Sequence, residues 1–180
     1  MVYVFLGNGF EEIETIAPID ILRRGEVETV LVGINEMNVT GAHGIVVQAD
    51  MPLEEVKLAA GDMLVLPGGL GGMQTIEGSI GAMELVRQAA ADDDIWLCAI
   101  CASPTILGRA GILVGKNAVC YPGMESGMNG AIPCMDRHAV IDGKIITGRA
   151  PGAAYEFGFA LLSALKGSDT VEQVRKQMHV

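Results

Sequence analysis

The stretch Ile95–Leu107 runs from a continuous apolar segment through a few small residues and a proline into a helical pattern. Its first half is apolar throughout, as expected for a strand of a parallel sheet that is buried on both faces. A strand that turns sharply into a helix leaves the side chain of the turn residue exposed above the sheet. Here the turn residue is Cys101. We therefore expect an α/β fold with this cysteine at an edge of the sheet.

The surroundings of Cys101 predict a reactive thiol. The first N–H groups of the following helix, and the positive end of its dipole, would point at the sulfur and favour thiolate over thiol. The alternative is a buried structural cysteine, which is the more common fate of a lone Cys. The order of strand, cysteine, small residues, proline and helix favours the reactive interpretation.

Composition argues against several classes of protein. The 180 residues are half hydrophobic and 19% charged, which predicts one compact domain over residues 1–180. A net charge of −10 argues against nucleic-acid and membrane-surface partners. No apolar run approaches the roughly 18 residues of a membrane span, and Val2–Leu6 is too short for a signal peptide. The four cysteines then predict free thiols and a cytoplasmic location.

Apolar strands alternate with helical segments along most of the chain, which predicts a mainly parallel sheet covered by helices on both faces. Strands are expected at Val2–Leu6, Glu28–Val32, Asp62–Leu66 and before Cys101, with a short edge or hairpin strand at Gly44–Gln48 and a hairpin of Val140–Ile141 with Lys144–Thr147. Helices are expected at Glu11–Arg24, Pro52–Ala59, Met73–Ala91, from Cys101 to about Leu113, at Pro151–Leu165 and at Thr170–Met178.

In folds of this kind, ligands bind beyond the carboxyl ends of the strands. Three turns belong at that edge: Gly7–Glu14, Pro67–Gly72 and Cys101–Ser103. The glycine-rich turn has no dinucleotide or P-loop fingerprint and could be a simple tight turn. Beside Cys101, its N–H groups could instead hold an oxyanion or an oxidised sulfur, together with the N–H of Ala102.

Other candidate groups are weaker. Cys98 and Cys101 match C-x-x-C, but Cys98 falls within the apolar strand and is interpreted as core. No metal is expected, because Cys120 and Cys134 lie far apart in sequence and no paired histidine ligands accompany them. Nothing in the sequence selects a base among the three histidines, His43, His138 and His179.

Carboxylates are better candidates for proton transfer. Glu11, Glu12 and Glu14 follow the first strand and reach the same edge as Cys101. At a helix start such residues usually just complement the dipole, and this is the default interpretation of Glu11 and Glu12. A carboxyl held against a thiolate in a partly buried niche should have a raised pKa. It could then donate a hydrogen bond to the sulfur.

Several motifs, in this order along nearly the whole chain, resemble the ThiJ/PfpI family and most closely its DJ-one (parkinsonism-protein) branch. They are Glu11–Thr15, Asp20–Arg24, Val65–Gly69, Ala99–Thr105, Gly148–Gly152 and Glu156–Phe157. The resemblance implies a flavodoxin-like three-layer α/β sandwich, a nucleophile elbow and a homodimer.

The resemblance also implies roles for single residues. Cys101 would be the elbow cysteine, easily oxidised to sulfinate, with Glu14 as its protonated hydrogen-bond partner. The N–H groups of Gly69 and Ala102 would form an oxyanion pocket. Two further positions, Glu11 and Arg24, match residues near the dimer interface.

The chain departs from the family pattern at one place. Relatives often carry His-Pro after the next strand, where this sequence has Tyr121-Pro122. The missing histidine argues against protease activity. It also weakens any glyoxalase or deglycase assignment that requires histidine as the base, although Glu14 could transfer protons in its place. The neighbouring Cys120 is either a second redox thiol or part of the core.

Three functional hypotheses follow. The first is a cofactor-independent enzyme of the deglycase or glyoxalase type, in which Cys101 adds to a small aldehyde or acts on a glycated amine or thiol. The second is a redox sensor or chaperone switched by oxidation of Cys101 to sulfinate. A thiamine-pathway or nucleotide-binding role is the weakest, because no phosphate-cradling motif faces the site.

Overall fold

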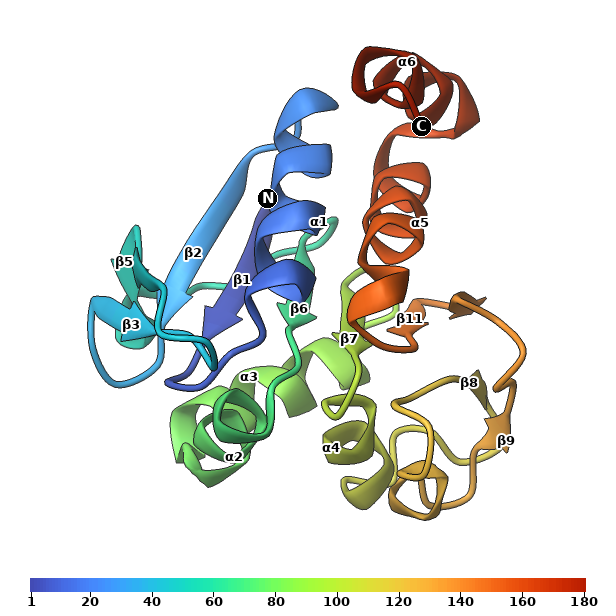
Figure 1. Cartoon of the computed structure of the whole chain (residues 1–180). Helices are drawn as coiled ribbons and strands as arrows, with labels where there is room; N and C mark the ends of the chain where they lie inside the picture. Colours follow the sequence, from blue (N-terminus) through green and yellow to red (C-terminus); the bar gives the residue numbers. More distant parts are fainter.

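Strand β1 (Val2–Leu6) lies inside a seven-stranded sheet in the computed structural model, which describes all 180 residues (Figure 1). The strand order is β10-β11-β7-β6-β1-β2-β5. All neighbours pair in parallel except β10 and β11, which form an antiparallel hairpin at one edge. The other strands are β2 (Thr29–Gly33), β5 (Met51–Pro52), β6 (Met63–Leu66), β7 (Trp96–Ile100), β10 (Ala139–Asp142) and β11 (Ile145–Gly148).

The pleat of β1 divides its side chains between two cores. Val2, Val4 and Leu6 belong to one hydrophobic cluster, and Tyr3 and Phe5 belong to the other. Because both faces are covered, each strand is apolar at nearly every position, which explains the continuous runs in the sequence.

Helices cover both faces of the sheet (Figure 1). One cluster includes side chains of α1 (Glu12–Arg24), α5 (Ala154–Lys166) and α6 (Ser168–Met178). The other includes side chains of α2 (Leu70–Gly78), α3 (Ile80–Ala91) and α4 (Pro104–Arg109). The predicted three-layer fold with a mainly parallel sheet is thereby confirmed.

Three predicted helices were wrong in extent. The segment Met73–Ala91 is two helices, because Ser79 is extended and its hydroxyl accepts the N–H of Ala82 at 3.3 Å as the cap of α3. The helix after Cys101 ends at Arg109, since Gly111 adopts a left-handed φ of 76°. Pro52–Ala59 forms just one 3₁₀ turn, Leu53–Glu55, because Val56 is extended.

Two small ladders lie beside the main sheet. Strands β3 (Asn38–Thr40) and β4 (Val46–Gln48) form an antiparallel hairpin, of which the sequence predicted the second strand. Strands β8 (Asn117–Ala118) and β9 (Ile132–Pro133) pair in parallel and were not predicted. No helix combines the length and the apolar character needed to cross a membrane.

Candidate active site

The three turns expected at one edge of the sheet do meet there. The N–H of Glu11 donates to the carbonyl of Gly68 at 3.0 Å, which joins the turn after β1 to the turn after β6. A Cβ on Gly69 would collide with the backbone of Gly9 and Glu11, and Gly69 has a φ of 85°. Glycine is therefore required at Gly69 both for its conformation and for this close approach.

Cys101 occupies a strained backbone conformation between β7 and α4. Its φ is 66°, in the left-handed region that costs a residue with a side chain on the order of 1–2 kcal/mol. The conformation is held from both sides: the N–H of Cys101 donates to Gly148 at 2.9 Å, and its carbonyl accepts from Tyr121 at 2.8 Å. The buried hydroxyl of Ser103 also donates to the Pro67 carbonyl. This is the geometry of a nucleophile elbow.

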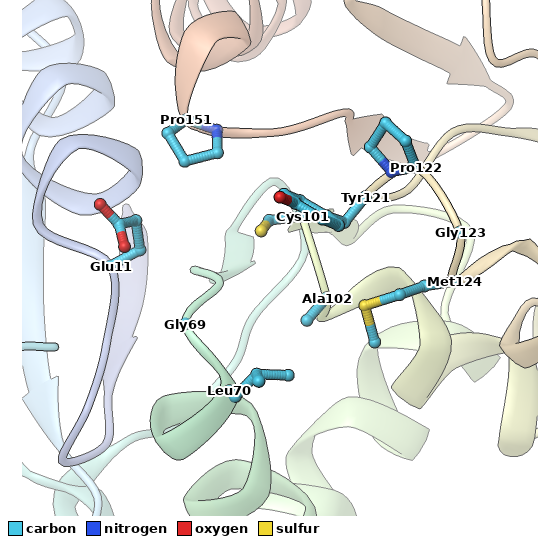
Figure 2. Close-up of a pocket in the computed structure, with 10 residues that line it drawn as sticks. All are labelled: Glu11, Gly69, Leu70, Cys101, Ala102, Tyr121, Pro122, Gly123, Met124 and Pro151. Atoms are coloured by element: carbon cyan, nitrogen blue, oxygen red, sulfur yellow. The ribbon is translucent and has the colours of Figure 1, made fainter.

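The elbow places Cys101 at the wall of a pocket of about 440 Å³ (Figure 2). The Cys101 residue is 8% exposed, so it is largely buried but still borders the pocket. The other lining residues are Glu11, Gly69, Leu70, Ala102, Tyr121, Pro122, Gly123, Met124 and Pro151.

Glu14 lies beside Cys101 and is completely buried. Neither carboxyl oxygen has a hydrogen-bond partner of ordinary geometry. Burial is the main reason that the pKa of Glu14 is raised to about 7, and the charge of Glu11 adds to the shift. The Cys101 thiol and the Gly68 N–H oppose it. The shift has the predicted direction and burial is its main cause, but the neighbouring thiol lowers the pKa instead of raising it as we expected.

The pKa of the Cys101 thiol is also raised, mainly by burial and then by the charge of an ionised Glu14. The N–H groups of Gly69 and Ala102 lower it, but by less. This differs from the thiolate expected at a helix start, because burial and the neighbouring Glu14 outweigh the effect of the two N–H groups. Consequently, Glu14 loses its proton near neutral pH while the Cys101 thiol keeps its own.

Gly69 and Ala102, the predicted oxyanion donors, both present their N–H groups to the Cys101 sulfur. They come from different turns: Gly69 precedes α2, whereas Ala102 follows the elbow. The structure thus brings together the four residues Cys101, Glu14, Gly69 and Ala102. Their catalytic roles remain predictions.

Glu12 has a structural role that was not predicted from the sequence. It is buried, and its Oε1 accepts the N–H of His43 at 2.8 Å while its Oε2 lies 2.9 Å from the His43 Nδ1. Burial opposes ionisation of Glu12, yet the hydrogen bonds from His43 lower its pKa overall. The hydrogen bond with Glu12 in turn raises the pKa of His43. Through these hydrogen bonds, Glu12 connects the β3–β4 loop to the start of α1.

Glu11, Glu12 and His43 are also the residues that could hold a cation, since one ligand atom from each lies within 4.8 Å of the others. The Nδ1 of His43 is 3.8 Å from Glu11 Oε1. The bond between His43 and Glu12 already satisfies both groups. We therefore derive no chemistry from a metal at this place.

The remaining predicted residues divide between pocket, core and surface. Tyr121 is 46% exposed and lines the pocket. Cys120 is completely buried in the cluster that contains Ala102, and burial raises its pKa to about 11, so its surroundings are those of a core residue. Arg24, at the far end of α1 from Glu11, is exposed and donates to Asp20 at 2.7 Å.

Of the other two histidines, neither reaches the site. His138 Nδ1 lies 3.5 Å from the Arg149 guanidinium, and His179 follows the end of α6. Cys98 is completely buried in the sheet, as predicted.

A mainly parallel α/β sandwich with a cysteine at a strained strand–helix turn defines a class of proteins with a nucleophile-elbow thiol. The chain belongs to the DJ-1/PfpI family, whose model matches residues 1–164. Within that family it falls in the DJ-1 branch. It is 34% identical to the dj-1beta protein of Drosophila melanogaster over 179 residues, covering 98% of this chain and 95% of the relative. The crystal structure of Drosophila DJ-1beta superposes with a TM-score of 0.91 at 33% identity, covering 99% and 97% of the two chains.

Other relatives carry names that describe an activity or a state. A protein of Pyrococcus abyssi named a deglycase is 30% identical, covering 92% of this chain and 99% of the relative. A Caenorhabditis elegans protein named a glutathione-independent glyoxalase is 30% identical, covering 93% and 89%. A structure of oxidized Toxoplasma gondii DJ-1 superposes with a TM-score of 0.87 at 28% identity, covering 98% and 96%.

Proposed function

We propose that this protein is a cysteine-dependent enzyme that acts on reactive aldehydes or their adducts with amines and thiols, in protection against such compounds. The observation that carries the proposal is a pocket-lining thiol on a strained turn beside a fully buried carboxyl with a pKa near 7. A carboxyl that exchanges its proton near neutral pH suits general acid–base catalysis.

The geometry supports the following sequence for methylglyoxal. Glu14 takes the proton of Cys101, and the sulfur attacks the aldehyde carbon to form a hemithioacetal. The oxygen that becomes negative faces the N–H groups of Gly69 and Ala102 and is then protonated.

Glu14 next carries the proton of the former aldehyde carbon to the oxygen of the neighbouring carbonyl, which gives an enediol. The proton of the hydroxyl on the sulfur-bearing carbon then moves to the neighbouring carbon, again through Glu14. The result is a lactoyl thioester on Cys101. Water hydrolyses the thioester, which releases lactate and restores the thiol. Oxidation of one carbon balances reduction of its neighbour, so the proposed reaction requires no cofactor.

Two further observations support this proposal. Relatives that align with more than nine-tenths of the chain are named a deglycase and a glutathione-independent glyoxalase. The four cysteines are free, which fits the reducing cytoplasm that we propose as its location.

Lactate formation from methylglyoxal tests the proposal. Wild-type protein should produce lactate steadily, and Cys101→Ala should reduce production to the uncatalysed rate. Glu14→Gln should lower kcat by about 10²–10⁴-fold, the usual contribution of a general acid–base. Unchanged turnover in Cys101→Ala would overturn the proposal.

A second candidate function is a redox sensor or chaperone, in which oxidation of Cys101 to sulfinate alters partner binding. The N–H groups of Gly69 and Ala102 beside the sulfur favour it, because they could hold sulfinate oxygens. After mild peroxide, mass spectrometry should find two added oxygens on Cys101, and fewer in Glu14→Leu. Equal oxidation of all four cysteines would contradict this function.

A further inference from the structure

The pocket beside Cys101 carries charge of one sign only. Among its lining residues, Glu11 is the sole residue with a charged side chain, and Leu70, Pro122, Met124 and Pro151 make most of the rest apolar. Figure 2 shows Glu11 on one wall, with Tyr121 and Met124 on the opposite side and Cys101 between them. A ligand bound to the sulfur must therefore occupy the space that the Glu11 carboxylate faces.

Within one chain, no cation fully compensates the charge of Glu11. Its one basic neighbour is His43, whose Nδ1 is 3.8 Å away but lies closer, at 2.9 Å, to Glu12. Two carboxylates thus share one imidazole, and the group stays negative even when His43 is protonated. The Glu11 side chain is only 14% exposed, so water screens its charge incompletely.

The field of Glu11 reaches the reacting groups. Its charge contributes to the raised pKa of Glu14, the carboxyl beside the sulfur. The backbone N–H groups that could offset a second negative charge, those of Gly69 and Ala102, already face the Cys101 sulfur. A carboxylate on the ligand would therefore lose its hydration without gaining a partner.

We infer that the pocket accepts neutral carbonyl compounds and rejects those that carry a carboxylate, and that Glu11 is the residue that sets this preference. The inference rests on the proposed function for its biological meaning, since it defines the class of aldehyde that Cys101 receives. The apolar wall would take the alkyl part of such a compound.

Alkylation of the thiol measures this preference without any substrate. Iodoacetamide and iodoacetate are similar in size and react in the same way, because in both cases the sulfur–carbon bond forms as iodide leaves. They differ in charge: iodoacetamide is neutral and iodoacetate is an anion. Mass spectrometry measures the alkylation rate of Cys101 with each reagent, and the iodoacetamide rate is divided by the iodoacetate rate. The half-buried Cys134, which does not line the pocket, provides an internal reference thiol in the same molecule.

The iodoacetamide-to-iodoacetate ratio should be about tenfold higher at Cys101 than at Cys134 in the wild type, as expected for one like charge nearby. Glu11→Gln should remove most of that difference, whereas Glu11→Asp, which keeps the charge, should retain it. Glu84→Gln removes an equal charge from the exposed surface of α3 and should leave the ratio unchanged.

Equal ratios at the two thiols in the wild type, no effect of Glu11→Gln, or an equal effect of Glu84→Gln would each overturn the inference. So would the absence of any iodoacetamide adduct on Cys101. A protein that shows the selectivity but forms no lactate from methylglyoxal contradicts the proposed function alone.

A second measurement extends the result to substrates. The neutral methyl ester of 4,5-dioxopentanoate should have a kcat/KM about tenfold above that of the free acid, and Glu11→Gln should narrow the gap. An equal kcat/KM for the two compounds in the wild type would overturn the inference.

Discussion

Glu14 and Cys101 meet over the α-carbon of Gly68: a Cβ at that position would collide with the Glu14 carboxyl and with the Cys101 side chain. The absence of a side chain at Gly68 therefore allows the acid and the thiol to lie against each other. Burial is the largest cause of the raised pKa of both groups; an ionised Glu14 raises the pKa of the Cys101 thiol further, whereas the thiol lowers the pKa of Glu14.

Gly68→Ala should separate this pair. The added methyl group must displace Glu14, Cys101 or the turn itself, at a cost of about 1–3 kcal/mol in the free energy of unfolding. We expect lactate formation from methylglyoxal to fall at least about tenfold. Gly78→Ala is the matched control, because a Cβ there meets open space in α2. Equal effects of the two substitutions would contradict this account.

The burial of Glu14 predicts a specific dependence of stability on pH. Its pKa is about 7 in the folded protein against 4.5 ordinarily, so the folded state binds the proton more tightly than the unfolded chain. The stabilisation is present below about pH 4.5 and is lost as the pH rises through 7. Its size is about 3 kcal/mol.

Chemical denaturation of the wild type and Glu14→Gln at several pH values isolates this contribution, because the other carboxyl groups titrate alike in both. The difference between the two proteins should change by about 3 kcal/mol between pH 4.5 and pH 8, with the glutamine variant gaining relative stability at high pH. A constant difference would show that Glu14 titrates normally.

Glu12→Ala should release the β3–β4 loop from α1. The N–H groups of His43 and Ile45 would lose their acceptor, which costs about 1 kcal/mol. Amide hydrogen exchange at His43 and Ile45 should become faster while the strands of the main sheet remain protected. Removal of an unpaired exposed carboxylate, as in Glu84→Ala, should leave this exchange unchanged.

The homodimer implied by the family resemblance is our proposal for the assembly, with α1 at the interface. Besides Arg24, this helix exposes Ile13 and Ile16, which are 53% and 43% accessible, and Glu11 directly precedes it. Sedimentation should give a dimer for the wild type, and Ile16→Asp should shift it towards monomer. A monomeric wild type at micromolar concentration would contradict the proposal.

The sequence was most informative where one local pattern determines the structure. Val2–Leu6 is apolar at every position because both faces of β1 are covered, and its predicted bounds match the observed ones. The same alternation of strands and helices placed the turns around Gly7, Pro67 and Cys101 at one edge. Parallel strands end at a common edge, so topology alone brings these turns together.

Features that depend on distant contacts could not be predicted. Glu12 acts through His43, 31 positions further along the chain, and nothing near Glu12 indicates that partner. The raised pKa of the Cys101 thiol depends on the depth of the sulfur, which is set by packing between layers. The break at Ser79 was a local signal that the apolar periodicity of Met73–Ala91 concealed.

The account depends most directly on the protonation of Glu14. Infrared or ¹³C NMR titration of the carboxyl groups, with Glu14→Gln to assign the signal, measures it. We predict one carboxyl that stays protonated until about pH 7 and whose signal is missing in Glu14→Gln. A Glu14 signal that titrates near pH 4.5 would contradict the claim that burial beside Cys101 keeps this carboxyl protonated up to neutral pH.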